Sequence, residues 1–441
     1  MKRKKSVELS FELLLVVLLA GAAGPARAGN VAMASGAVAA GATNALSLPE
    51  VLRLALRHNP ELEGAGYRVR VADGQARQAG LWANPDLDLS AEDWPTGQRF
   101  SQSKAMVGVS QTVPFPGKKS LERQAARAGV RATEAELRQR QTELERDVKV
   151  AFYRVLASER RREISQELVE LACAVADTAR KRVEAGAAGM QEQLRAEVEQ
   201  ERAQTEQAEV SQENAVARQT LVTLLGRPDL KDAPLAGTLS EGVNTSPTEE
   251  TPDMWLKSHP RVVAGRAAQE RAGLQVRRAR LEPAPDVKLG VAGGREGVTG
   301  AALVEFRLSV PLPFWDRNKG RVQEAQANDA LAGADLTVIE QQLLKEWNDA
   351  QSRFCIASNQ TSNYRERILP KSEAALKLVR EGFDNGKFGF MDLLDIQRTT
   401  AEARLAYQEK LFELNAAQAE LESLRAASQT ESTNFQSPGT H

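Results

Sequence analysis

Apolar residues recur at helical spacing over two very long stretches of the chain. Residues 119–185 contain no proline, and their apolar positions follow one another at intervals of four and three, as in Leu144, Val148, Ala151 and Val155. Residues 319–384 repeat the pattern at Leu336, Ile339, Leu343 and Trp347. This spacing predicts two amphipathic helices of about 100 Å each. We expect Pro370 to bend or locally open the second.

The period falls to two in residues 86–113 and 286–310. In the clearest run, Val304, Phe306, Leu308 and Val310 alternate with Leu303, Glu305, Arg307 and Ser309. The alternation predicts two β-hairpins, each with one apolar and one polar face. Half-burial in a soluble sheet would give the same pattern. Four strands cannot close a barrel and an isolated hairpin is marginal in water, so we expect strand partners from other copies of the chain.

An internal duplication organises these elements. Asn59-Pro60, Pro85-Asp86, Gly186 and Gly189 are matched 200 residues later by His259-Pro260, Pro285-Asp286, Gly386 and Gly389. We therefore predict two repeats, residues 46–226 and 252–426, joined by a linker over residues 227–251. Each repeat contains an opening helix, a hairpin, a long helix, a glycine turn and a shorter returning helix. The returning helices are expected at 190–225 and 391–425.

The two ends of the chain carry other signals. A basic start at residues 1–5, an apolar run from Leu13 to Ala20 and the A-x-A pattern at 26–28 predict a cleaved signal peptide over residues 1–28. The alternative is an uncleaved helical anchor, for which the apolar run is short. We expect a flexible segment at 29–45 and a disordered tail at 427–441.

Composition narrows the possible functions. The 58 basic and 59 acidic residues leave a net charge of −1, which argues against a nucleic-acid partner. Cys173 and Cys355 stand at different heights on their helices, so no disulfide is expected. The three histidines are isolated, and no phosphate-binding loop or nucleophile motif is present. We expect neither enzyme activity nor a cofactor or metal site.

Four motifs carry a resemblance to a known family. They are residues 55–60 (ALRHNP), 110–119 (SQTVPFPGKK), 311–314 (PLPF) and 386–395 (GKFGFMDLLD). Together with the duplication, they resemble the TolC-like family of outer-membrane efflux proteins. The run at 115–118 is most similar to the branch that serves cobalt-zinc-cadmium resistance.

The resemblance implies a mainly helical fold with a small β part. Three chains would each give four strands to a twelve-stranded barrel in outer-membrane lipid, continuous with an α-helical barrel in the periplasm. It implies a homotrimeric passive duct for heavy-metal cations or drugs, driven by an inner-membrane pump through a periplasmic adaptor protein. The partners would dock at the helix turns, at Gly186, Gly189, Gly386, Lys387 and Gly389.

The family also implies an aperture at the second turn. Asp392 and Asp395 match the aspartates that ring the tunnel mouth in the family, and both lie on one helix face. Alternatively, they are solvated acids that the helix dipole favours. The first repeat carries Glu192 and Arg195 instead. The family's basic gating partner has no clear match, although Lys387 is nearby.

Other assignments stay open at this point. Trp94, Phe115, Phe314 and Trp315 stand at strand ends, where they are either interfacial aromatics or ordinary packing residues. Two other functions compete with the duct. An adaptor of the same kind of pump would carry one long helical hairpin between β-rich modules, and an exported coiled-coil spacer would not require alternation at 304–310.

Overall fold

The computed structural model describes residues 45–92, 104–240, 255–296 and 299–426. All of its elements belong to one unit that begins at Ala45. The predicted signal peptide, most of the flexible segment, the C-terminal tail and Trp94 lie outside the described residues. None of the described helices is long and apolar enough to cross a membrane.

Both long helices form where the apolar spacing predicts them. Helix α4 (Lys118–Glu184) is continuous over 67 residues. Its counterpart consists of α8 (Lys319–Asn363), the π-helical segment η4 (Tyr364–Ile368) and α9 (Leu369–Asp384). The wider turns of η4 end two residues before Pro370, which has no N–H for the helical ladder. The predicted local opening at Pro370 is confirmed.

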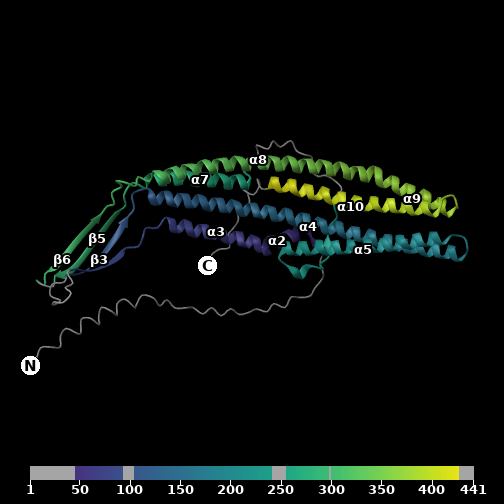
Figure 1. The fold of residues 1–441 in the computed structure, drawn as a ribbon, viewed down its shortest axis with the longest axis horizontal. Coiled ribbons are helices and arrows are strands. Elements are labelled where there is room, and N and C mark those ends of the chain that lie inside the picture. The colour runs from purple at the N-terminus through teal and green to yellow at the C-terminus, as the bar shows by residue number, and fades with distance from the viewer. Residues whose placement is uncertain (1–44, 93–103, 241–254, 297–298, 427–441) are drawn as a thin grey trace, which may run out of the picture. The chain divides into compact units, whose positions relative to one another are not determined.

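Shorter helices accompany each long one. They are α2 (Leu48–His58), α3 (Pro60–Ala79) and α5 (Met190–Leu225) in the first repeat, and α7 (Pro260–Leu281) and α10 (Phe390–Ala426) in the second. Asn59 separates α2 from α3, and its Oδ1 accepts the N–H groups of Glu61 at 2.9 Å and Leu62 at 3.1 Å. Figure 1 shows α3, α2 and α5 along α4, and α7 and α10 along α8 and α9.

The core follows the seams between these helices. In the first repeat, Val51 of α2 and Leu225 of α5 pack with Val148, Phe152 and Val155 of α4, all almost fully buried. The second repeat has its own core, made of Trp255, Val262, Leu343 and Trp347. Each long helix is thus stabilised by the shorter helices that lie along it.

The predicted hairpins join into one antiparallel sheet. Its strands are β2 (Asp86–Glu92), β3 (Lys104–Val113), β5 (Val287–Glu296) and β6 (Ala302–Ser309), in the order β2-β3-β5-β6. The expectation that hairpin partners come from other copies was therefore wrong for the inner edges, because β3 pairs with β5 over ten residue pairs. Strands β2 and β6 remain as open edges. Figure 1 shows the sheet at one end of the helices and the glycine turns at the other.

The start of the predicted linker packs against the helices. Residues 228–230 form a short 3₁₀ helix, and β4 (Leu235–Ala236) pairs in parallel with β1 (Leu46–Ser47). Further on, Asn415 of α10 exchanges hydrogen bonds with the backbone of Ser240 at 3.1 and 3.2 Å. This part of the linker therefore ties the first repeat to the second.

Candidate functional site

One face of the sheet is apolar and exposed. The register places Leu87, Val109, Val291 and Phe306 in one row across all four strands, with exposed fractions from 48% to 83%. Neighbouring rows on this face add Leu89, Val107, Leu289, Val304 and Leu308. A continuous apolar face of this kind is a contact surface for lipid or protein, because its exposure to water is unfavourable in free energy. The predicted alternation of faces is confirmed.

The opposite face of the sheet is polar and closely packed. It carries Asp88, Ser90, Lys288, Glu305 and Arg307, and these line a small hollow together with glycines. Gly108 and Gly294 allow the strands to approach, because an added Cβ would lie 2.7 Å from the Ala292 Cβ and 2.2 Å from the Ala105 carbonyl oxygen, respectively. The sheet thus has a polar face and an apolar face on opposite sides.

A buried lysine joins the sheet to the helices. Lys118, the first residue of α4, has a side chain only 3% exposed, and its Nζ lies 2.9 Å from Asp286 Oδ1. The same oxygen accepts the Phe115 N–H at 2.7 Å. Partial burial tends to raise the pKa of Asp286, but the Phe115 N–H and the Lys118 ammonium outweigh it and lower the pKa below its usual value. Lys319, the first residue of α8, is exposed.

Both helix turns end the long helices in the same way. Gly186 and Gly386 adopt positive φ angles of 69° and 67°. In the first turn, the Ala187 N–H donates to the Arg182 carbonyl and the Gly186 N–H to Val183, at 2.8 and 2.9 Å. Lys387 and Gly386 make the equivalent bonds to Gly382 and Phe383 in the second turn. These are Schellman motifs, which explains why glycine stands at both positions.

The two turns are packed together. Phe383 and Phe390 of the second turn contact a cluster from α4 and α5 that contains Val175, Ala176, Ala179 and Ala196. The Arg182 guanidinium lies over the Phe383 ring at 5.8 Å. The predicted docking glycines, Gly186, Gly189, Gly386 and Gly389, and Lys387 therefore lie at one end of the molecule.

The carboxylates of the two turns differ in their partners. Glu192 lies 3.1 Å from the Arg182 guanidinium. In the second repeat Gly382 replaces that arginine, and the Phe388 ring occupies the space where a Cβ would stand. Asp392 instead accepts the Gly389 N–H at 2.9 Å, as an acid in the first turn of a helix does. Comparing residues 182 and 382 in the sequence would have found this difference.

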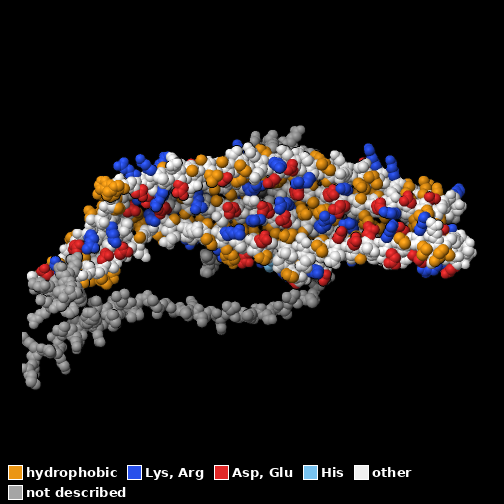
Figure 2. Space-filling model, viewed as in Figure 1, with side chains coloured by type: hydrophobic (Ala, Val, Ile, Leu, Met, Phe, Trp, Pro, Cys, Tyr) orange, Lys and Arg blue, Asp and Glu red, His pale blue; other side chains and the backbone are white. Residues whose placement is uncertain are grey.

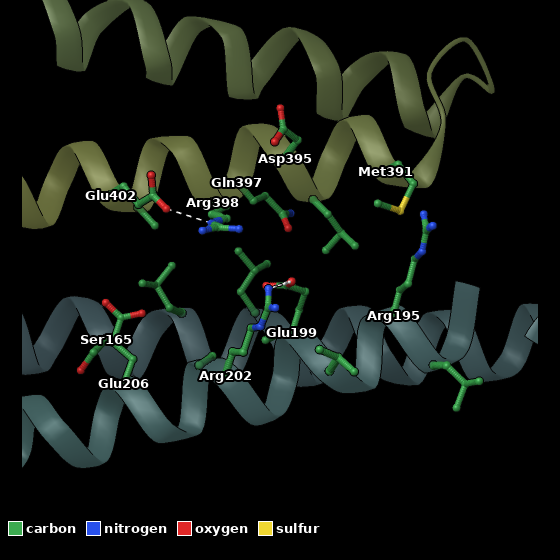
Figure 3. Close-up of a pocket in the computed structure, with 18 of the residues that line it drawn as sticks. Ser165, Arg195, Glu199, Arg202, Glu206, Met391, Asp395, Gln397, Arg398 and Glu402 are labelled. Atoms are coloured by element: carbon green, nitrogen blue, oxygen red, sulfur yellow. Dashed lines mark hydrogen bonds and ion pairs between the residues drawn. The ribbon is translucent and has the colours of Figure 1, made fainter. Parts of the chain in front are cut away.

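Asp392 and Asp395 are both exposed, and neither forms an ion pair within the described residues. Figure 3 shows the Asp395 carboxylate on the side of α10 turned away from α5. The bond to Gly389 shows that Asp392 serves as a helix-start acid. Both side chains also remain open to solvent at the turn end, so an aperture role is compatible with the same geometry.

A long groove lies beside these residues. It has a volume of about 1020 Å³ and runs between α5 and α10, with α4 beneath. Its exposed apolar residues are Met190, Leu194, Val198 and Met391, and its charged border contains the pairs Arg202–Glu199 and Arg398–Glu402 at 2.9 and 2.8 Å (Figure 3). The sequence reasoning missed this groove, although the spacing of Met190, Leu194 and Val198 by four marks a helix face that is apolar and uncovered.

The predicted strand-end aromatics are open to solvent where the structure describes them. Phe115 is 39% exposed, Phe314 66% and Trp315 94%. Ordinary packing within the chain is therefore wrong for Trp315. Among the described residues, no group of three or more histidine, cysteine or acidic side chains is arranged to hold a metal ion.

Known proteins share this architecture. Residues 51–227 and 251–430 match the family described as outer membrane efflux protein, one match for each repeat. The cobalt-zinc-cadmium resistance protein CzcC of Cupriavidus metallidurans is 27% identical over 366 residues, which cover 83% of this chain and 86% of the relative. The nickel-cobalt-cadmium resistance protein NccC of Alcaligenes xylosoxydans xylosoxydans is 25% identical over 309 residues, 70% of this chain and 69% of the relative.

The fold is shared with a solved structure. CusC, which is described as forming a transmembrane channel, superposes with a TM-score of 0.76 at 19% identity, over 86% of this chain and 91% of that one. Because the family matches cover most of the chain, the adaptor and coiled-coil alternatives are excluded. The chain belongs to the outer membrane efflux protein family, whose members are outer-membrane channels with a large periplasmic helical part rather than enzymes.

Proposed function

We propose that the protein is the outer-membrane duct of a tripartite metal efflux system and that it works as a homotrimer. The observation that carries this proposal is the four-stranded sheet, with an apolar outer face, a polar inner face and two open edges. Four strands in each of three copies make twelve, enough to close a barrel without free edges. Lipid requires such closure, because unpaired backbone groups are costly in hydrocarbon.

The duct itself is passive. The apolar face is in contact with outer-membrane lipid, and the polar face with its Asp88, Lys288, Glu305 and Arg307 lines a wet lumen. The helices continue that lumen through the periplasm. We infer that the energy for transport comes from an inner-membrane pump.

The turn end receives the partner proteins. The groove between α5 and α10 has an apolar floor and charged borders, which suits the apolar stripe of a partner helix. We infer that the helical part of a periplasmic adaptor lies in it, with the turns at Gly186–Gly189 and Gly386–Gly389 at the end that faces the pump. A Met190→Glu/Leu194→Glu variant tests this role, because two charges on the floor would weaken adaptor binding.

Asp392 and Asp395 form the aperture of the proposed trimer. Three copies bring six carboxylates to the turn end, where they attract cations and repel one another. Asp392 has no arginine partner like Arg182 among the described residues, whereas Asp395 interacts electrostatically with Arg398. The closed state therefore requires screening by cations or protonation.

The cargo proposed here is a divalent transition-metal cation. Both relatives named above are metal-resistance proteins, for cobalt, zinc and cadmium and for nickel, cobalt and cadmium. We place the selection of the metal in the pump rather than in the duct.

Metal tolerance of a deletion strain tests the function. The strain should become sensitive to zinc, cobalt, cadmium or nickel salts and recover with the intact gene. A variant with Leu89→Asp and Phe306→Asp, which places charges on the apolar sheet face, should not restore tolerance because it cannot insert. Leu331→Asp is the control, since Leu331 is also exposed, at 58%, but lies on α8. Unchanged tolerance in the deletion strain, with drug sensitivity instead, would contradict the metal assignment.

A further inference from the structure

Large apolar side chains flank both open edges of the sheet at its helix end. Leu81 and Trp82, just before β2, are 55% and 57% exposed. After β6, the exposed fractions are 63% for Leu312, 66% for Phe314 and 94% for Trp315. Figure 2 shows hydrophobic side chains gathered where the helices meet the sheet. Exposed aromatic surface of this extent marks a contact with another molecule.

The segment after β6 is held in a defined conformation. The Phe314 N–H donates to the Leu312 carbonyl at 2.9 Å, and the Asn318 N–H donates to Asp316 Oδ1 at 2.8 Å. Asn318 Nδ2 in turn donates to the Ala279 carbonyl of α7 at 2.7 Å. The Phe314 and Trp315 rings stand edge to face, 6.1 Å apart. The aromatic pair is thus preorganised, so little conformational entropy remains to be lost on contact.

Strand direction decides what covers these residues. Strand β2 leads away from the helices and β6 returns to them, because every neighbouring pair in the sheet is antiparallel. When β6 of one copy pairs with β2 of the next, the antiparallel order continues around the ring. Residues 310–315 of one copy then lie beside residues 81–85 of the next, at the same end of the seam.

We propose that Leu81 and Trp82 of one copy pack against Leu312, Phe314 and Trp315 of the next, as an apolar clasp between subunits. The clasp covers the interface between two subunits at the level where the strands end and the helices begin. On the strand side of the clasp, hydrogen bonds between β6 and β2 close the interface. On the helix side, packing between helices closes it. This proposal rests on the trimer of the proposed function and deepens it, because it assigns a second copy as the occupant of these exposed residues.

Cross-linking tests the clasp directly. In a Cys173→Ala/Cys355→Ala background, Trp82→Cys and Trp315→Cys are combined and outer membranes are treated with a short bis-maleimide. Covalent dimers and trimers are expected, while each single-cysteine variant should remain monomeric on denaturing gels. Trp82→Cys with Leu378→Cys is the matched negative control, since Leu378 is 65% exposed but lies on α9 near the turns.

Light scattering of the detergent-solubilised protein separates the two levels of the proposal. A trimer without the Trp82→Cys/Trp315→Cys cross-link would overturn the clasp and leave the trimer standing, with the aromatics assigned to lipid. A monomer would overturn both. If the cysteine variants do not assemble, Trp82→Glu and Trp315→Arg provide a second test. Each alone should lose the heat-resistant trimer band, and the pair should recover it; a folded pair that fails to recover it contradicts the clasp.

Discussion

The two repeats share the order of their main elements but satisfy their polar groups differently. Asn59 caps α3 with an amide, whereas His259 caps α7 with an imidazole, whose Nδ1 accepts the Arg261 N–H at 3.2 Å. Lys118 is buried against Asp286, whereas Lys319 is exposed. Glu192 pairs with Arg182, whereas Asp392 has no cationic partner among the described residues.

The shared positions in the two repeats are those that the backbone requires, and the positions that differ are those that carry charged side chains. A duplicated fold needs the same caps, turns and helix starts in both copies, because the backbone geometry is the same. The side chain that occupies each cap, turn or helix start can differ between the two repeats. In the first turn Glu192 is paired with Arg182, whereas in the second turn Asp392 has no ion-pair partner among the described residues. Substitutions at equivalent positions therefore test whether the divergence matters.

The largest expected effect is a loss of unfolding free energy at low pH, and it comes from the helix cap at His259. Burial lowers the pKa of His259 from 6.5 to about 4, and the nearby Arg261 adds to this, while Glu143 opposes it. The unfolded chain binds this proton first, so the folded state loses stability as the pH falls from about 6.5 to 4. The full loss is about 3 kcal/mol of unfolding free energy below pH 4.

Urea unfolding of the solubilised protein at pH 7 and pH 4.5, followed by circular dichroism, measures this loss. His259→Asn copies the cap of the first repeat and should remove the His259 contribution, whereas the exposed His58→Asn should leave it unchanged. An equal pH dependence in wild type and His259→Asn would show that the imidazole is not the responsible group.

A smaller effect is expected at the two helix starts. Lys118→Ala leaves the Asp286 carboxylate without its ammonium partner, at a cost of about 2 kcal/mol of unfolding free energy. Lys319→Ala removes an exposed side chain and should change stability by less than about 0.5 kcal/mol. The same urea titration at pH 7 compares them. Equal losses of unfolding free energy in both variants would mean that the Lys118–Asp286 ion pair does not stabilise the contact between the sheet and the helices.

Local signals were sufficient to predict most elements. The 3.6-residue period, the alternation of β6 and the glycines at 186 and 386 predicted helices, strands and turns to within a few residues. The opening at Pro370 was predicted as well, since it follows from the missing N–H of a single residue. Each of these features depends on near neighbours in the chain.

Long-range contacts could not be predicted in the same way. The pairing of β3 with β5 joins residues that are about 180 positions apart, and no residue type on either strand specifies the partner. The bond between Lys118 and Asp286 and the groove between α5 and α10 likewise need the packed arrangement of both repeats. The family resemblance pointed to Asp392 and Asp395, whose aperture role stays a prediction, and a comparison of Arg182 with Gly382 in the sequence would have added the missing arginine.

The smallest expected effect concerns the turn carboxylates. In bilayers, Asp392→Ala/Asp395→Ala should weaken the block of ion current by multivalent cations about tenfold, which corresponds to about 1.4 kcal/mol of binding free energy. Glu192→Gln should leave the block unchanged, because that carboxylate is already paired with Arg182.

The decisive variant is Gly382→Arg, which supplies the second repeat with the arginine of the first. Although Phe388 must move to admit it, the new guanidinium would compensate Asp392 and should weaken the block in the same direction. An unchanged block in the Asp392→Ala/Asp395→Ala variant would show that the two acids only stabilise their helix start, and that the divergence between the turns has no bearing on the ions that pass.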